Sequence, residues 1–174
     1  HNTNFTVESG PFSNGIRIND GTKLDVTGGS SFTTKGNYNN GIYATDAMSA
    51  KPINIVDASF NIEAGSNSNA IYAQGGQFDI SGGSIQVNGK YNNGIYIVSQ
   101  TNSGVVADKV AIKNMNIDVN TPDNTAAPGA HNTGIYVGNG RTISEITGTT
   151  INVNGTVNAG TVVNNNVGIV VGDN

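Results

Sequence analysis

The hexapeptide YNNGIY occurs twice in the chain, as Tyr38 to Tyr43 and as Tyr91 to Tyr96. It belongs to a frame in which a small residue precedes an isoleucine and an apolar residue follows two positions after it. The frame recurs at six isoleucines, Ile16, Ile42, Ile71, Ile95, Ile135 and Ile169. The spacing runs from 24 residues (Ile71 to Ile95) to 40 residues (Ile95 to Ile135), and self-similarity at such a period is typical of repeat architectures.

Two further short segments of alternating apolar and polar residues lie between successive copies of the frame, for example Phe78 to Ile80 and Ile85 to Val87. Alternation with period two predicts strands with one buried face, and the Gly, Asn, Ser and Asp residues between them predict turns. No window has a helical period. The sequence therefore predicts an all-β fold, a right-handed three-sheet parallel β-helix of about six coils. An antiparallel β-sandwich is the alternative.

Residues 1–174 are expected to form a single β-helix segment. The chain begins with His1 rather than Met, and the repeat reaches both ends without a polar capping segment. We therefore expect the segment to be a fragment of a longer solenoid. Repeats longer than the shortest one predict inserted loops at 45–52, 98–109, 120–133 and 154–166.

Composition excludes several classes of function. Eight Lys and Arg residues against twelve Asp and Glu residues give a net charge of −4, so a nucleic-acid partner is not expected. The chain has no Cys, which excludes disulfides and thiolate sites. No apolar run approaches the roughly 18 residues of a membrane span, so membrane contact by this segment is not expected either.

The sequence has few residues of the types that form catalytic or metal sites. His1 and His131 are the two histidines, which leaves almost no material for a Ser-His-Asp triad or a zinc site. The carboxylates and amides at 118–124 do not match an EF-hand loop. No catalytic residue, metal or cofactor is predicted. The one enzymatic alternative uses Asp25 and Asp79, outward residues two coils and about 9.6 Å apart with Asn54 between them, near the upper carboxylate spacing of inverting glycosidases.

Asparagine recurs two residues before the isoleucine of the frame, at Asn14, Asn40, Asn69 and Asn93. Amides stacked about 4.8 Å apart can hydrogen-bond to one another along the axis. The sequence therefore predicts a structural amide ladder that needs no ligand.

Tyrosine follows the isoleucine in four coils, at Tyr43, Tyr72, Tyr96 and Tyr136. Alternation points these side chains outward, so they predict an exposed aromatic row about 15 Å long. Tyrosine offers a large contact area at low entropic cost, and we expect this row to bind ligand. The alternative is that the rings stack on one another or lie under neighbouring loops.

A second outward row is expected on the last strand of each coil. It consists of the uncharged residues Thr33, Asn61, Gln86, Asn116 and Asn152. Exposed sheet faces usually carry charges that discourage association. The row therefore predicts self-association between copies of the chain through amide hydrogen bonds, with an ordinary solvated face as the alternative.

The frame NGIYA, together with the pattern GGxFxIxGGxIxVxG at 75–89, resembles the passenger region of bacterial autotransporters of the type V secretion pathway, over residues 12–171. Related repeats occur in filamentous haemagglutinin-like exoproteins. The resemblance implies a β-helical stalk exported to the surface of a Gram-negative bacterium, of a kind that includes adhesins, aggregation factors and toxins. No serine-protease motif is present in these 174 residues, so the resemblance implies no protease activity here.

We therefore expect a surface-exposed or secreted autotransporter adhesin that binds without catalysis. The expected partners are a host surface glycan, a matrix protein or another copy of the chain. Two alternatives remain open: a polysaccharide lyase or hydrolase on the same fold, and an inert stalk that displays a distal domain.

Overall fold

The computed structural model of the chain describes residues 2–8, 10–19, 23–44, 53–63, 65–74, 77–98, 109–120, 131–138, 141, 143–154 and 166–172. The four predicted loops lie largely outside these residues. Within the described residues the chain forms strands β1 to β17 and no helix. The described part of the chain accordingly contains no helix that is long and apolar enough to cross a membrane.

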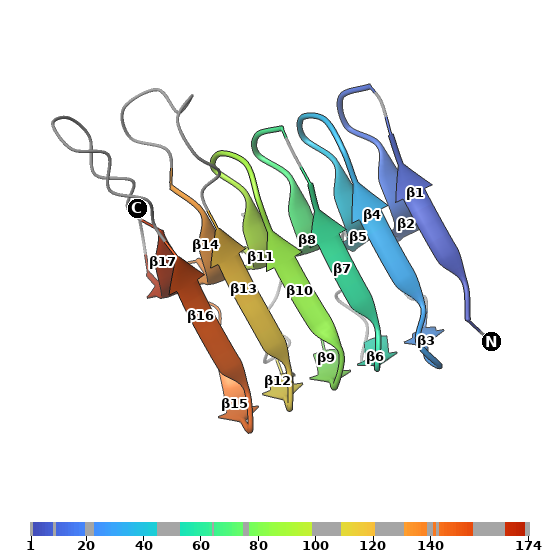
Figure 1. The fold of residues 1–174 in the computed structure, drawn as a ribbon. Coiled ribbons are helices and arrows are strands. Elements are labelled where there is room, and N and C mark those ends of the chain that lie inside the picture. Colours follow the sequence, from blue (N-terminus) through green and yellow to red (C-terminus); the bar gives the residue numbers. More distant parts are fainter. Residues whose placement is uncertain are drawn as a thin grey trace, which may run out of the picture.

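The strands form three sheets, and each sheet takes every third strand of the chain (Figure 1). Sheet A contains β1 (Asn4–Val7), β4 (Ser31–Thr34), β7 (Ser59–Ile62), β10 (Ser84–Val87), β13 (Asn116–Asn120) and β16 (Thr150–Asn154). Sheet B contains β2 (Asn14–Ile18), β5 (Asn40–Ala44), β8 (Asn69–Ala73), β11 (Asn93–Ile97), β14 (Thr133–Val137) and β17 (Val167–Val171). Sheet C contains β3 (Leu24–Val26), β6 (Ile53–Val56), β9 (Gln77–Ser81), β12 (Lys109–Lys113) and β15 (Ile143–Thr147).

Every strand pair among the described residues is parallel, and each strand from β1 to β14 pairs with the strand three places later in the chain. One coil therefore contributes one strand to each sheet. This arrangement confirms the prediction of a three-sheet parallel β-helix of about six coils. The antiparallel sandwich is wrong, because it requires antiparallel pairs.

The isoleucines of the repeat frame lie in register along sheet B. Ile42 pairs with Ile71, Ile71 with Ile95, and Ile95 with Ile135. All four side chains are fully buried. Stacking identical apolar residues coil on coil builds a continuous core column, so burial on this scale supplies the main favourable term for folding.

The small residue before the isoleucine is required by close packing at the corner between sheets A and B. A Cβ atom at Gly94 would lie 2.5 Å from the carbonyl oxygen of Gly134 and 3.2 Å from the side chain of Ile85. Both distances are shorter than normal contacts, so glycine lets neighbouring coils approach at this corner.

Burial of the apolar columns decreases toward both ends of the described solenoid. In the last coil Ile146, Val153, Ile169 and Val171 count among the exposed large hydrophobic residues. In the first coil Phe5, Ile16 and Leu24 are only partly buried. The best-packed core therefore lies in the middle coils.

Candidate functional site: a groove along sheet B

The four predicted tyrosines come together on the outer face of sheet B. Tyr43 pairs with Tyr72, Tyr72 with Tyr96, and Tyr96 with Tyr136. Their ring centroids are 4.9, 5.4 and 4.7 Å apart, and the rings of each pair are stacked. We call these four residues the tyrosine stack.

The stacking of the four rings is the alternative that was set beside an exposed aromatic row. Tyr43, Tyr72 and Tyr96 are half-buried, and Tyr136 is 9% exposed. The reason is that strands about 4.8 Å apart hold in-register rings at stacking distance. Arg17 lies 5.7 Å from the Tyr43 ring centroid and covers the N-terminal end of the stack. The stack therefore presents ring edges and hydroxyl groups, more than ring faces, to a ligand.

Stacking changes the chemistry of the central ring. Burial raises the pKa of Tyr96, and the neighbouring Tyr136 and Tyr72 raise it further. An ordinary tyrosine with a pKa of about 10 is already protonated at neutral pH, and the upward shift keeps the phenol of Tyr96 a hydrogen-bond donor to higher pH.

The predicted ladder of asparagines lies beside the stack and is confirmed. The amide nitrogen of Asn40 donates to Asn14, that of Asn69 to Asn40, and that of Asn93 to Asn69, at 2.8, 2.8 and 2.9 Å. We call this set the outer ladder. An amide has two donor hydrogens and two lone pairs on its oxygen, so bonds within the ladder use only half of the capacity of each inner member.

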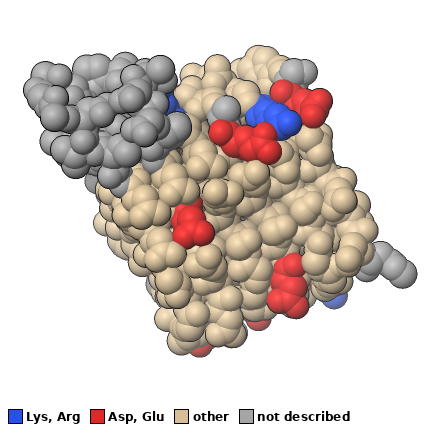
Figure 2. All heavy atoms as spheres, viewed as in Figure 1, with Lys and Arg blue, Asp and Glu red and all other residues tan. Residues whose placement is uncertain are grey.

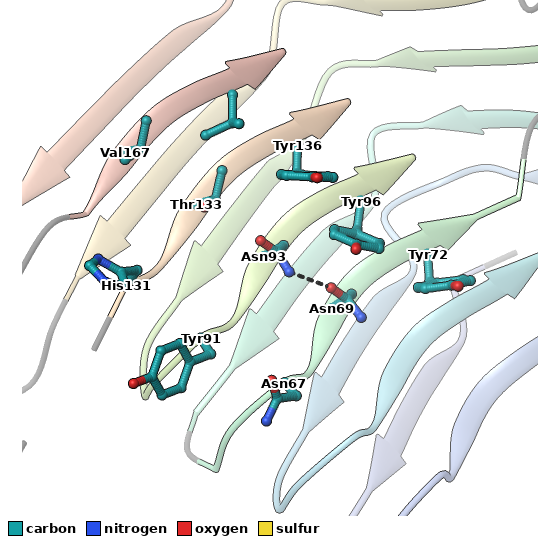
Figure 3. Close-up of a pocket in the computed structure, with 11 residues that line it drawn as sticks. Asn67, Asn69, Tyr72, Tyr91, Asn93, Tyr96, His131, Thr133, Tyr136 and Val167 are labelled. Carbon is teal, nitrogen blue, oxygen red and sulfur yellow. Dashed lines mark hydrogen bonds between the residues drawn. The ribbon is translucent and has the colours of Figure 1, made fainter. Parts of the chain in front are cut away.

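A groove of about 690 Å³ lies over the outer ladder. Figure 3 shows Asn69 and Asn93 between Tyr72 and Tyr96 on one side and Tyr91 on the other. The groove is lined by Asn67, Asn69, Tyr72, Tyr91, Asn93, Tyr96, His131, Thr133, Tyr136, Val167 and Val170. Its floor is made of the amides of Asn69 and Asn93, the hydroxyl of Thr133 and, on the last coil, Val167, and its described walls are mainly aromatic.

The wall opposite the tyrosine stack was missed by sequence reasoning. It comes from the turns between sheets A and B, at the position four residues before the frame isoleucine. We call its members the turn row: Phe12, Tyr38, Asn67, Tyr91 and His131. The recurrence of a ring at this position, visible in both YNNGIY copies, is the signal that could have revealed it.

The turn row has an unusual backbone. The φ angles of Phe12, Tyr38, Asn67 and Tyr91 are 66°, 59°, 57° and 54°. Asparagine adopts this left-handed conformation readily, whereas bulky side chains seldom do. The rings are nevertheless exposed: Tyr38 and Tyr91 expose 44% and 45% of their surface. Aromatic side chains at these turns cost conformational energy, and they leave nearly half of their surface, or more, open to a ligand.

A second ladder, also missed, lies inside the coil one residue before the outer ladder. It consists of Asn39, Ser68, Asn92, Asn132 and Asn166, and we call it the inner ladder. The backbone amide of each of the first four donates to the side chain of the next, at 2.9 to 3.1 Å. Asn39, Ser68, Asn92 and Asn132 have no exposed surface. The inner ladder therefore fixes the turns that carry the turn row.

The predicted self-association row needs one correction. Gln86 pairs with Asp118, and Asp118 with Asn152, whereas Asn116 pairs with Ser84 in the neighbouring row. The alternating residues 115–119 allow two registers, with either Asn116 or Asp118 opposite Gln86. The observed register places the buried Met115 at the corner before β13, and this brings Asp118 opposite Gln86. The row is thus Thr33, Asn61, Gln86, Asp118 and Asn152, and it is not free of charge. The face of sheet A is otherwise mostly uncharged (Figure 2).

The carboxylates of the enzymatic alternative lie as predicted, with Asp25, Asn54 and Asp79 in register on sheet C. Asp25 forms an ion pair with Lys23 at 2.8 Å and accepts a hydrogen bond from Asn54 at 2.6 Å. These contacts lower the pKa of Asp25, which suits the general base of an inverting pair and not its general acid. Within the described residues no three His, Cys, Asp or Glu side chains group as a metal site would require. Asp123 and Asn124 lie outside those residues.

No protein-family model, curated protein or solved structure matches the chain.

Proposed function

We propose that this chain is a segment of a bacterial adhesin of the autotransporter-passenger kind, exposed on the surface of a Gram-negative cell or secreted from it. It binds an extracellular ligand on the outer face of sheet B and carries out no catalysis. The resemblance described above supports the class, and the parallel β-helix is the architecture that this class implies.

The observation that carries the proposal is the groove between the tyrosine stack and the turn row. A β-helix presents here aromatic side chains beside amides that have unused hydrogen-bond donors and acceptors. Such a preformed surface is well suited to recognition, because little conformational entropy is lost on binding. The inert stalk is less well supported. A spacer gains nothing from exposed aromatic rings at left-handed turns, and strained residues of this kind cluster at functional sites.

The enzymatic alternative, which requires Asp25 and Asp79 on sheet C, has weaker support than the adhesive function. Asp25 is committed to Lys23 and Asn54, and its lowered pKa favours the ionised form. Asp79 lies two strands away on an open sheet face, and the groove is on a different sheet. The geometry therefore favours binding.

An array of glycans and extracellular-matrix proteins, probed with the purified chain, tests the proposal. We expect capture of at least one ligand, and weaker capture by the double variant Tyr72→Phe, Tyr96→Phe. This variant keeps both rings in the stack and removes two hydroxyl groups from the groove. Absence of any capture, or turnover of polyuronides by the chain, would refute an adhesive, non-catalytic role.

A further inference from the structure

We infer that the groove over the outer ladder binds a single uncharged, linear polysaccharide chain that runs along the solenoid axis. This inference rests on the proposed adhesive function and names the ligand class of the same site. It adds the turn row as the second wall of that site.

The lining residues determine the charge of the ligand. Among the described residues that line the groove, none is Asp, Glu, Lys or Arg. These residues offer amide, hydroxyl, phenol and imidazole groups, which donate and accept hydrogen bonds. An anionic or cationic polymer would lose hydration in this groove without gaining an opposite charge, so a neutral ligand fits best.

The direction of the groove determines the shape of the ligand. Its lining continues coil by coil across β8, β11, β14 and β17, where the floor position holds Asn69, Asn93, Thr133 and Val167 and the stack position holds Tyr72, Tyr96, Tyr136 and Val170. The four strands span about 14 Å at a strand spacing of about 4.8 Å. This spacing is close to the length that one sugar ring adds to a β-1,4-linked polysaccharide. Successive sugars can therefore lie on successive coils, of which β8, β11 and β14 each offer a polar floor residue beside a tyrosine and β17 offers two valines.

The two walls offer different contacts to a sugar. The rings of the tyrosine stack cover one another, so this wall provides ring edges and hydroxyl groups. Tyr91 meets His131 at 63°, in an edge-on contact with centroids 6.1 Å apart, and Tyr91 exposes 45% of its surface. Tyr91 can therefore pack a ring face against the C–H face of a sugar while the floor and the opposite wall bind its hydroxyls.

A peptide fits this groove less well than a polysaccharide. Extended peptides commonly bind by adding a strand to an open sheet edge. Three of the four strands under the groove, β8, β11 and β14, pair with a neighbour on both sides and offer no edge, whereas β17 is the last strand of the described sheet. Over β8, β11 and β14 the groove offers side chains alone, and these suit a ligand that carries many hydroxyl groups.

Binding of tetrasaccharides to the whole chain, measured by calorimetry, tests the inference. The uncharged probes are cellotetraose and chitotetraose. The charged probes of the same length are tetragalacturonate and the deacetylated chitosan tetramer. We expect at least one uncharged probe to bind, and each charged probe to bind more weakly.

Two matched variants locate the site. Tyr91→Asn removes a ring that lines the groove, and Tyr38→Asn removes an equivalent ring that lies outside the lining. Both tyrosines have the same backbone conformation and exposure, and Asn67 is the natural asparagine of this row. We expect Tyr91→Asn to weaken binding about three- to tenfold and Tyr38→Asn to leave it unchanged, with both variants folded as judged by circular dichroism.

The outcomes separate the two proposals. Equal binding by wild type and Tyr91→Asn, tighter binding of a charged probe, or capture of matrix proteins without any of these sugars would overturn the inference and leave the adhesive function standing. Failure of the chain to bind any array ligand would overturn both.

Discussion

Removing the side chain of Asn92 tests whether the inner ladder holds the coils together. Its carbonyl oxygen accepts the buried backbone N–H of Ser68 at 2.9 Å, and its amide nitrogen donates to the carbonyl of Asn88 at 2.6 Å. Asn92→Ala leaves the N–H of Ser68 without a partner in a position that water does not reach. The substitution also removes the bond to Asn88.

The size of the effect follows mainly from these two bonds, because the third bond of the side chain, from its amide nitrogen to the carbonyl of Gly65, is long at 3.4 Å. A buried donor left unsatisfied costs about 1–3 kcal/mol, and loss of a partly buried hydrogen bond about 0.5–1.5 kcal/mol. We therefore expect Asn92→Ala to lower the free energy of unfolding by about 2–4 kcal/mol. Urea unfolding followed by far-UV circular dichroism measures this change.

The chain supplies its own control for this experiment. Ser68 occupies the same ladder position one coil earlier, where its hydroxyl accepts the N–H of Asn39 at 3.1 Å and donates to Gly36 at 3.0 Å. Asn92→Ser should therefore cost less than half as much as Asn92→Ala. Gln86→Ala, an exposed change, should stay within about 0.5 kcal/mol of wild type. If Asn92→Ala behaves like Gln86→Ala, the inner ladder does not stabilise the solenoid.

Three other predictions concern the core, the tyrosine stack and sheet A. Ile71→Ala, at a fully buried site, should lower the free energy of unfolding by about 2–5 kcal/mol in the same urea assay, because fixed coils on both sides prevent collapse of the cavity; a loss well below 1 kcal/mol would contradict the register. The unfolded chain releases the Tyr96 proton at lower pH than the folded chain does, because folding raises this pKa from its ordinary 10.0. Stability should therefore fall as pH rises above that value, and the fall should be smaller in Tyr96→Phe; equal slopes in alkaline urea titrations would argue against this. If sheet A mediates self-association, Asp118→Asn should strengthen it and Gln86→Glu should weaken it in sedimentation experiments, whereas unchanged sedimentation of both variants would exclude this flank.

The fold was predictable because the same type of apolar residue stacks on itself from one coil to the next. Column packing places Ile42, Ile71 and Ile95 in register, so one sequence frame predicts both the strands and their pairing. The same reasoning failed at β13, where Met115, Ile117 and Val119 all alternate correctly and either of two registers buries them. The choice depends on which residue fills the corner, and a three-dimensional contact decides that.

The candidate site was only partly predictable. Alternation places Tyr72 and Tyr96 on the outer face, but their stacking depends on side-chain rotamers that period alone does not determine. The inner ladder was missed because hydropathy predicts that amides such as Asn92 and Asn132 face solvent. They are buried because hydrogen bonds from neighbouring coils satisfy them, which compensates the loss of hydration.

Each coil pairs only with the coils next to it. The solenoid can therefore be lengthened or shortened by whole coils through insertion or deletion of one repeat in the gene. The shortest repeat runs for 24 residues from Ile71 to Ile95. A tandem duplication of such a unit would insert one strand into each sheet, one rung into each ladder and one ring into the stack, and would lengthen the solenoid by about 4.8 Å. Contacts at both junctions would repeat those already present. Unequal recombination between repeats therefore lengthens or shortens the recognition surface without redesign of the core.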